Sequence, residues 1–468
     1  MAARISRRAL RSLSSRLRPF TTQRTYSSSP IREQTAFSYS IPVGTKLHYE
    51  QLFESISKRK VIANPAGHNA AVLLATPDFA RTLEDEEFMS QFVKTMSASA
   101  QVDQFHVLGA IVDHVAPPVG SYKPIQGISV LRGHLDDMLP QLWETAPPKS
   151  QDDADTVSAL SFKLGKPHHA QQVTWSPDRE LQVVADLGLF APLVPLTSPR
   201  AVTESFGNII RGIEVEGKSI PASTELEEAV NALHKHSISS GIMSGPVGVW
   251  AVVTPYESES SDLAEWLENG PDPIVAGQDV EDVKDLTRAT ATHLRTLYGL
   301  GGRFYKILSG GGGWGAKKGL LSLDPQQTHF ALSEEEQMAG FMKTMSDSGF
   351  TPRGSRIQFF MSAPALPEVN RPLVPGIAFG VSGETSYPED PEAIEGFIGG
   401  HFGALSNHAV FLSGPGSPNG EGTKLSVPHS QIFAADEDRT GESDNSILGN
   451  LVPDVGSLAV FGWAKAFL

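Results

Sequence analysis

Residues 299–324 read Gly299-Leu-Gly-Gly-Arg-Phe-Tyr-Lys-Ile-Leu-Ser-Gly-Gly-Gly-Gly-Trp-Gly-Ala-Lys-Lys-Gly-Leu-Leu-Ser-Leu-Asp324, the densest glycine run of the chain. Glycine alone enters positive φ freely, so such a run lets the backbone pass close to another strand or to a ligand. The apolar segments Phe304–Leu308 and Leu320–Leu323 predict a strand that enters the run and a strand that leaves it. The stretch is therefore a strand–loop–strand unit near the join of two halves.

The glycines of this run also match a nucleotide-binding pattern, Gly310-x-Gly312-x-x-Gly315. A dinucleotide site needs a helix after its glycines, so that the helix N-terminus faces the pyrophosphate. Here a strand is predicted instead, at Leu320–Leu323. The phosphate-loop motif also fails, because no serine or threonine follows Lys318. What remains is a looser interpretation, in which successive glycine amides form an anion-binding nest.

We expect ligand contacts from this run and from a second segment, Ser205–Arg211, where a Gly-Asn turn precedes a strand that carries an arginine. Trp314 can stack on a ligand. The alternative is a plain connection with a core tryptophan, solvated lysines and a surface arginine. The candidate ligand-binding residues are Gly310, Gly311, Gly312, Gly313, Trp314, Gly315, Lys317, Lys318, Asn208 and Arg211.

The amino terminus differs sharply from the rest of the chain in charge. Residues 1–32 hold eight arginines, many serines and no acidic residue. Arg-rich, Ser-rich and acid-free starts are typical of organellar transit peptides, so residues 1–35 predict targeting to the mitochondrial matrix. The alternative is a basic tail that binds nucleic acid. The chain as a whole has a formal charge of −15, so the remainder is more acidic still.

Composition excludes several classes of protein. The chain has no cysteine, which excludes disulfides, thiolate metal sites and cysteine nucleophiles. No apolar run approaches the roughly 18–20 residues that cross a bilayer, so we expect a soluble protein without a transmembrane segment. An acidic body repels phosphate backbones, which disfavours nucleic acid as a partner.

Motifs for catalysis are weak. No pair of histidines has a recognised metal-ligand spacing, and no Gly-x-Ser-x-Gly elbow occurs. His106, His114 and His134 are the remaining candidates for acid–base groups. We therefore assign no catalytic residue, no metal ligand and no cofactor.

Hydrophobic patterns predict a mixed α/β fold with two related halves flanked by helices. Ala71–Ala75 and Phe105–Val112 suit strands on either side of a helix, and further helices are expected at Val280–Tyr298 and Pro391–Leu405. The expected divisions are a transit peptide (1–35), a connecting segment with one helix (36–65), an N-terminal α/β domain (66–298), and a C-terminal α/β domain that begins with the glycine run (299–468).

The segments Ala71-Val-Leu-Leu-Ala-Thr-Pro-Asp-Phe79, Val107–Val112 and Gly127–Leu131 occur in an order that resembles the FIST domain. This family is a sensory module of F-box and signal-transduction proteins, and the chain is similar to a fungal-type mitochondrial member. The resemblance covers about residues 66–250, with a weaker echo over 330–465. The chain departs from it in its glycine run and in lacking an F-box or signalling effector.

The resemblance implies a non-catalytic protein that binds a small ligand, such as an amino acid or a similar metabolite. Two other functions stay open. One is an enzyme acting on an anionic metabolite or nucleotide through residues 310–315. The other is a mitochondrial assembly or scaffold factor with an unidentified protein partner.

Overall fold

The described part of the chain combines helices with four sheets, which confirms the predicted mixed α/β fold. The computed structural model describes residues 36–41, 49–58, 68–97, 104–118, 124–135, 170–175, 187–240, 248–254, 270–299, 301–310, 319–324, 354–363, 376–383, 396–413, 422–435 and 458–463. None of the described helices has the length and apolar character needed to span a membrane.

The first sheet carries the segments that resemble the FIST family. Its order is β17-β1-β5-β2-β3, with β2 and β3 parallel and the other pairs antiparallel. Its strands are β1 (Ala36–Ser40), β2 (Ala70–Ala75), β3 (His106–Ile111), β5 (Gly127–Gly133) and β17 (Gly396–Gly399). The helices before and between its strands are α1 (Tyr49–Lys58), η1 (Pro77–Phe79), α2 (Ala80–Glu84) and α3 (Glu86–Ser97).

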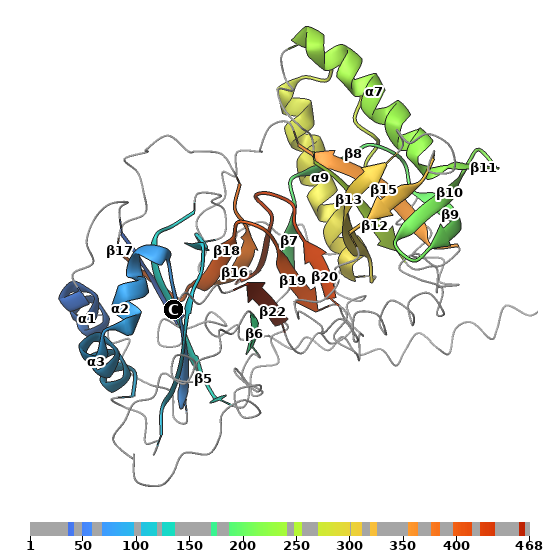
Figure 1. The fold of residues 1–468 in the computed structure, drawn as a ribbon. Coiled ribbons are helices and arrows are strands. Elements are labelled where there is room, and N and C mark those ends of the chain that lie inside the picture. The colour runs from blue at the N-terminus through green and yellow to red at the C-terminus, as the bar shows by residue number, and fades with distance from the viewer. Residues whose placement is uncertain are drawn as a thin grey trace, which may run out of the picture.

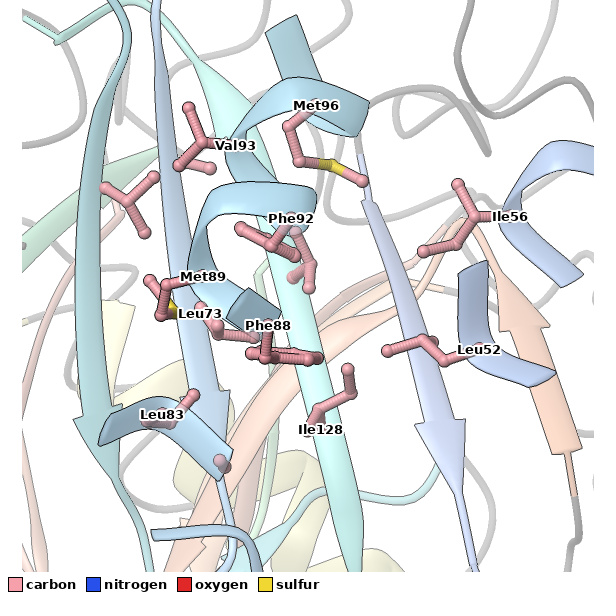
Figure 2. Close-up of a cluster of buried hydrophobic side chains, with 14 of the residues drawn as sticks. Leu52, Ile56, Leu73, Leu83, Phe88, Met89, Phe92, Val93, Met96 and Ile128 are labelled. Atoms are coloured by element: carbon pink, nitrogen blue, oxygen red, sulfur yellow. The ribbon is translucent and has the colours of Figure 1, made fainter. Parts of the chain in front are cut away.

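These helices cover one face of the first sheet (Figures 1 and 2). Phe88 and Phe92 of α3 and Leu52 of α1 are fully buried against Leu73 of β2. Replacing one such phenylalanine with alanine typically costs about 3–5 kcal/mol. Within the expected connecting segment 36–65, α1 matches the one predicted helix, and the described residues also supply the inner strand β1 and part of the core.

One arginine is buried beneath α3. Arg132 of β5 donates from Nη2 to the carbonyl oxygen of Met96, 3.1 Å away in the last turn of the helix. A cation is favourable there, because the carbonyls at a helix C-terminus carry partial negative charge. Burial lowers the pKa of the guanidinium to about 10.

A second group of strands closes into a ring, which we call the barrel. Antiparallel pairs join β10 to β14, β14 to β13, β13 to β12, β12 to β15, β15 to β9, and β9 back to β10. The bounds are β9 (Arg200–Phe206), β10 (Ile209–Val215), β12 (Val249–Thr254), β13 (Arg303–Gly310), β14 (Leu321–Leu323) and β15 (Arg356–Ser362). Strands β8 (Leu193–Pro195) and β11 (Lys218–Pro221) extend it outside the ring.

Apolar side chains fill the barrel, as expected for a small ring of strands. Ile213, Val253, Tyr305 and Phe359 belong to one buried cluster that also includes Leu226 of the adjacent helix. The helices beside the barrel are α7 (Ala222–Ser240) and α9 (Val280–Gly299) (Figure 1).

The remaining sheets lie between the barrel and the first sheet (Figure 1). The second sheet has the order β4-β18-β16-β21-β7, and the third has the order β20-β19-β22-β6. The second comprises β4 (His114–Val115), β7 (Leu187–Phe190), β16 (Gly376–Val381), β18 (Phe402–Ser406) and β21 (Gln431–Ala435). The third comprises β6 (Ala170–Trp175), β19 (Val410–Ser413), β20 (Gly422–Leu425) and β22 (Leu458–Trp463).

The prediction of a helix over Pro391–Leu405 was wrong, because β17 and β18 occupy its described part. Close contact between neighbouring backbones favours a strand here rather than a helix. A Cβ atom on Gly403 would overlap the carbonyl of Ala378 on the neighbouring strand β16. β16 and β18 are parallel, and this pairing is stabilised across the sheet rather than within a helix.

Strands from the two expected domains share sheets. β12 and β13, which lie on either side of residue 299, are paired neighbours in the barrel. β1 pairs with β17, which comes more than half the chain later. The expected division at residue 299 therefore does not coincide with a division between sheets.

Candidate functional site

Three of the predicted ligand-binding residues are described, and they lie on the barrel: Gly310 on β13, Asn208 in the turn before β10, and Arg211 on β10. Gly310 is the last residue of β13 and lies opposite Leu321 of β14. The glycine run thus joins two antiparallel neighbours, as the strand–loop–strand prediction requires. Gly311, Gly312, Gly313, Trp314, Gly315, Lys317 and Lys318 lie outside the described residues.

The far end of the run is also fixed. Gly319 has a φ of +89°, and a Cβ atom there would lie 2.7 Å from the Cβ atom of Pro221. Pro221 ends β11, immediately before α7. The backbone therefore leaves the run in close contact with the start of that helix, in a conformation that favours glycine.

The structure directs the other two predicted residues to opposite sides of β10. Asn208 Nδ2 donates to the carbonyl oxygen of Leu323 at 2.8 Å and to Ser322 Oγ at 3.3 Å, both on β14. Arg211 instead pairs with Glu204 of β9 at 2.9 Å, with both side chains 52% exposed. Asn208 thus holds a strand in place, and the charge of Arg211 is balanced by its neighbour.

A different set of polar residues converges at one end of the second sheet, and we call it the polar row. The parallel strands β16 and β18 both end there, and the flanking strands β4 and β21 both begin there. In open α/β sheets, ligands commonly bind beyond the carboxyl ends of parallel strands. The polar row consists of Asp113, His114, Ser382, Asn407, His408 and His429.

Backbone hydrogen bonds tie the ends of these strands together. The N–H of Ser382 donates to the carbonyl oxygen of Ser406 at 2.9 Å, which joins the ends of β16 and β18. The N–H of Val381 donates to the carbonyl oxygen of Ser430 at 2.8 Å, which joins β16 to the start of β21. The side chains of the polar row therefore project from a rigid frame.

Asn407 links the residues at the centre of the polar row. Its backbone N–H donates to Asp113 Oδ2 at 2.7 Å, and its side-chain Oδ1 accepts a hydrogen bond from Ser382 Oγ. Ser382 is thus bonded to an amide rather than to a histidine. A serine nucleophile needs an adjacent base to accept its proton, and this contact does not provide one.

His429 completes the row in a backbone conformation that non-glycine residues rarely adopt. Its φ is +61°, and a Cβ atom on Gly383 would overlap the His429 ring. The ring therefore lies directly over the end of β16. Left-handed conformations of this kind persist when the surrounding structure enforces them, and they are common at functional sites.

Burial lowers the pKa of two histidines in the polar row. It lowers the pKa of the His114 imidazole, and this effect exceeds the opposing influence of the Asp113 charge and of a hydrogen bond with Asn407. Burial also lowers the pKa of His429. Both rings therefore favour the neutral form, and the row contains no lysine or arginine.

Two other histidines, His401 and His293, are buried in the interior and are not part of the polar row. The ring Nε2 of His401 lies 2.7 Å from the carbonyl oxygen of Ala116, and burial lowers the pKa of this ring. His293 of α9 is packed close to Gly270, and burial lowers its pKa as well. Among the described residues, no group of three or more histidines and acids is placed to hold a metal ion.

Sequence reasoning singled out His114 but did not assemble the polar row around it. Of the other acid–base candidates, His106 begins β3, and His134 follows β5 and contacts the ring of His68. A usable signal was present: Asp113, Ser382 and Asn407 each follow a short apolar segment closely. Only the pairing of strands brings those segments to one edge.

Comparison of the chain with family models, with curated proteins and with solved structures finds no match. The resemblance to the FIST family therefore stays a prediction that rests on the quoted segments.

Proposed function

We propose that this protein binds a small polar metabolite, an amino acid or a similar molecule, at the polar row and does not transform it. One observation carries the proposal: polar side chains from four neighbouring strands converge where the parallel strands β16 and β18 end. The site offers both donors and acceptors, which an amino acid requires.

The contacts within the row favour binding over catalysis. Asn407 engages Ser382 and Asp113 at the same time, so these groups are oriented by one another. The resemblance to a sensory family supports the same role, as a mitochondrial ligand-binding protein in signal transduction. Fusion of residues 1–35 to a reporter tests the location, and a reporter that stays in the cytosol would contradict it.

The glycine run supports a rival function, in which an enzyme holds an anionic metabolite or nucleotide. Both ends of the run are fixed, at Gly310 by pairing with β14 and at Gly319 by contact with Pro221. A loop held at both ends on a rigid scaffold is a common place for binding residues. In this case Lys317 and Lys318 would neutralise the anion.

Thermal unfolding of the full chain, with a panel of amino acids and nucleotides, separates these functions, because a bound ligand stabilises the folded state. We expect amino acids to raise the Tm, and Asn407→Ala to remove that shift. Lys306→Ala is a matched control, because Lys306 is exposed on β13 and is not part of the polar row.

Other outcomes would redirect the proposal. A nucleotide that raises the Tm, with the shift lost in Lys317→Ala but kept in Asn407→Ala, would favour the enzyme. No shift with any compound, together with a stably co-purifying protein, would overturn ligand binding and favour the scaffold function.

A further inference from the structure

We propose that the polar row recognises a protonated amine, and that the carboxylate of an amino acid contributes nothing to binding there. This inference rests on the proposed function, since it concerns the same site. It specifies which chemical group the site selects, and it follows from the charges and hydrogen bonds of the row.

Asp113 is the acceptor on which the inference depends. Its Oδ2 atom accepts the N–H of Asn407 at 2.7 Å. A carboxylate has about four acceptor positions, so this bond leaves capacity for further donors. Within the described part of the chain, no lysine or arginine forms a salt bridge with Asp113. Its negative charge is thus available to a cationic ligand.

The rest of the row contains no lysine or arginine that could compensate this charge. The titratable groups are Asp113 just before β4, His114 at the start of β4, His408 after β18, and His429 before β21. The end of β16 contributes Ser382 and Gly383, which do not titrate. Because burial favours a neutral ring at His114, that imidazole can accept a hydrogen bond from an ammonium group.

Binding of a ligand carboxylate would be disfavoured at the polar row. It would lose hydration near the Asp113 charge without a cation to replace the water, which is unfavourable. The formal charge of the chain, −15, acts in the same direction, because a negative field attracts cations and repels anions.

The test compares ligands that differ by one group. Calorimetric titration of the full chain at pH 7.5 would use alanine, ethylamine and propanoate, and then phenylalanine, phenethylamine and 3-phenylpropanoate. In at least one series we expect the amine to bind at least as well as the amino acid, and the acid not to bind. Asp113→Asn should weaken amine binding by about tenfold or more, as loss of a hydrogen bond to a charged group does.

Lys306→Ala serves as the control and should leave each affinity unchanged. If amino acids and the acids bind but the amines do not, the inference is overturned and the proposed function stands. If none of the compounds binds in either series, nor any amino acid of the thermal panel, both are overturned. Should Asp113→Asn fail to fold, the comparison of ligands on the unaltered chain still decides the question.

Discussion

The glycine run at the end of the barrel and the polar row at the end of the second sheet are built in opposite ways. The run is one contiguous stretch, and the structure uses its two ends to join the neighbouring strands β13 and β14. The row takes its residues from distant parts of the chain, from Asp113 to His429, and the pairing of strands unites them. The glycine run connects the two strands of a hairpin, whereas the dispersed residues of the polar row bring together a greater variety of polar side chains.

Single glycines in the second sheet and in the β9–β10 turn also differ in how closely other atoms approach them. In the second sheet, glycines at 380 and 403 allow backbone atoms of neighbouring segments to approach closely. At the barrel end, Gly207 of the β9–β10 turn has no atom within 4 Å of the position that a Cβ would take. We expect substitutions to be costly in the sheet and mild in the turn.

The largest effect should come from Gly403→Ala. The added Cβ would overlap the carbonyl of Ala378, so β16 and β18 must separate beneath the polar row. We expect the free energy of unfolding to fall by about 3 kcal/mol, as overpacking at a buried site does. The matched variant Gly207→Ala, at a φ of +55° in open space, should cost only about 1 kcal/mol. Denaturant unfolding measures both, and equal losses would contradict the comparison.

The next effect concerns acid pH. Burial lowers the pKa of His401 in the folded protein, so below a pH of about 6.5 the unfolded state binds the proton more readily. Stability from this group is thus complete above that pH and falls as the pH drops toward the folded pKa, by at most about 1.4 kcal/mol per pH unit. The unfolding free energy of His401→Gln should therefore decline less steeply between pH 7 and 5.

His293→Gln provides the same measurement beside the barrel, because burial also lowers the pKa of His293. If the unfolding free energy of both variants changes with pH in parallel with that of the unaltered chain, the buried histidines do not govern its sensitivity to acid.

A smaller effect is expected at Asn208. Replacement with alanine removes the hydrogen bonds to Leu323 and Ser322, which should lower the free energy of unfolding by about 1–2 kcal/mol. Hydrogen exchange should accelerate in β14. Ser322→Ala removes only the longer of the two bonds, so its effect should be smaller. A ligand-affinity loss without a stability loss in Asn208→Ala would instead favour the original assignment to a binding site.

The smallest effect should be that of Arg211→Ala. Its ion pair with Glu204 is half exposed on both sides, and exposed pairs contribute about 0–1 kcal/mol. Arg200→Ala gives the contrast within the same barrel, because Glu225 is only 13% exposed and would lose its cation. Thermal unfolding of both variants tests the ranking, and a larger loss for Arg211→Ala would reverse it.

Local patterns in the sequence predicted the elements well and their assembly poorly. The apolar run at Ala71–Ala75 and the helical period at Val280–Tyr298 match β2 and α9 closely, because burial determines each pattern. The helix predicted over Pro391–Leu405 was wrong, because the glycines near Phe402 allow close contact between strands.

The candidate site was harder to predict than the elements. His114 was identified by residue type alone. Its neighbours Ser382 and Asn407 depend on the parallel pairing of β16 with β18, which no local pattern encodes. The pairing of β12 with β13 across residue 299 is likewise a property of the assembled sheet.

Closure of the barrel also has a consequence for the order of events during synthesis. The ring is completed only when β9, near residue 200, pairs with β15, which ends at Ser362. Until about three-quarters of the chain has left the ribosome, both edges of the incomplete ring can pair with other chains. A protein of this design should therefore depend on chaperones while it is being made, and truncation before β15 should make the product prone to aggregation.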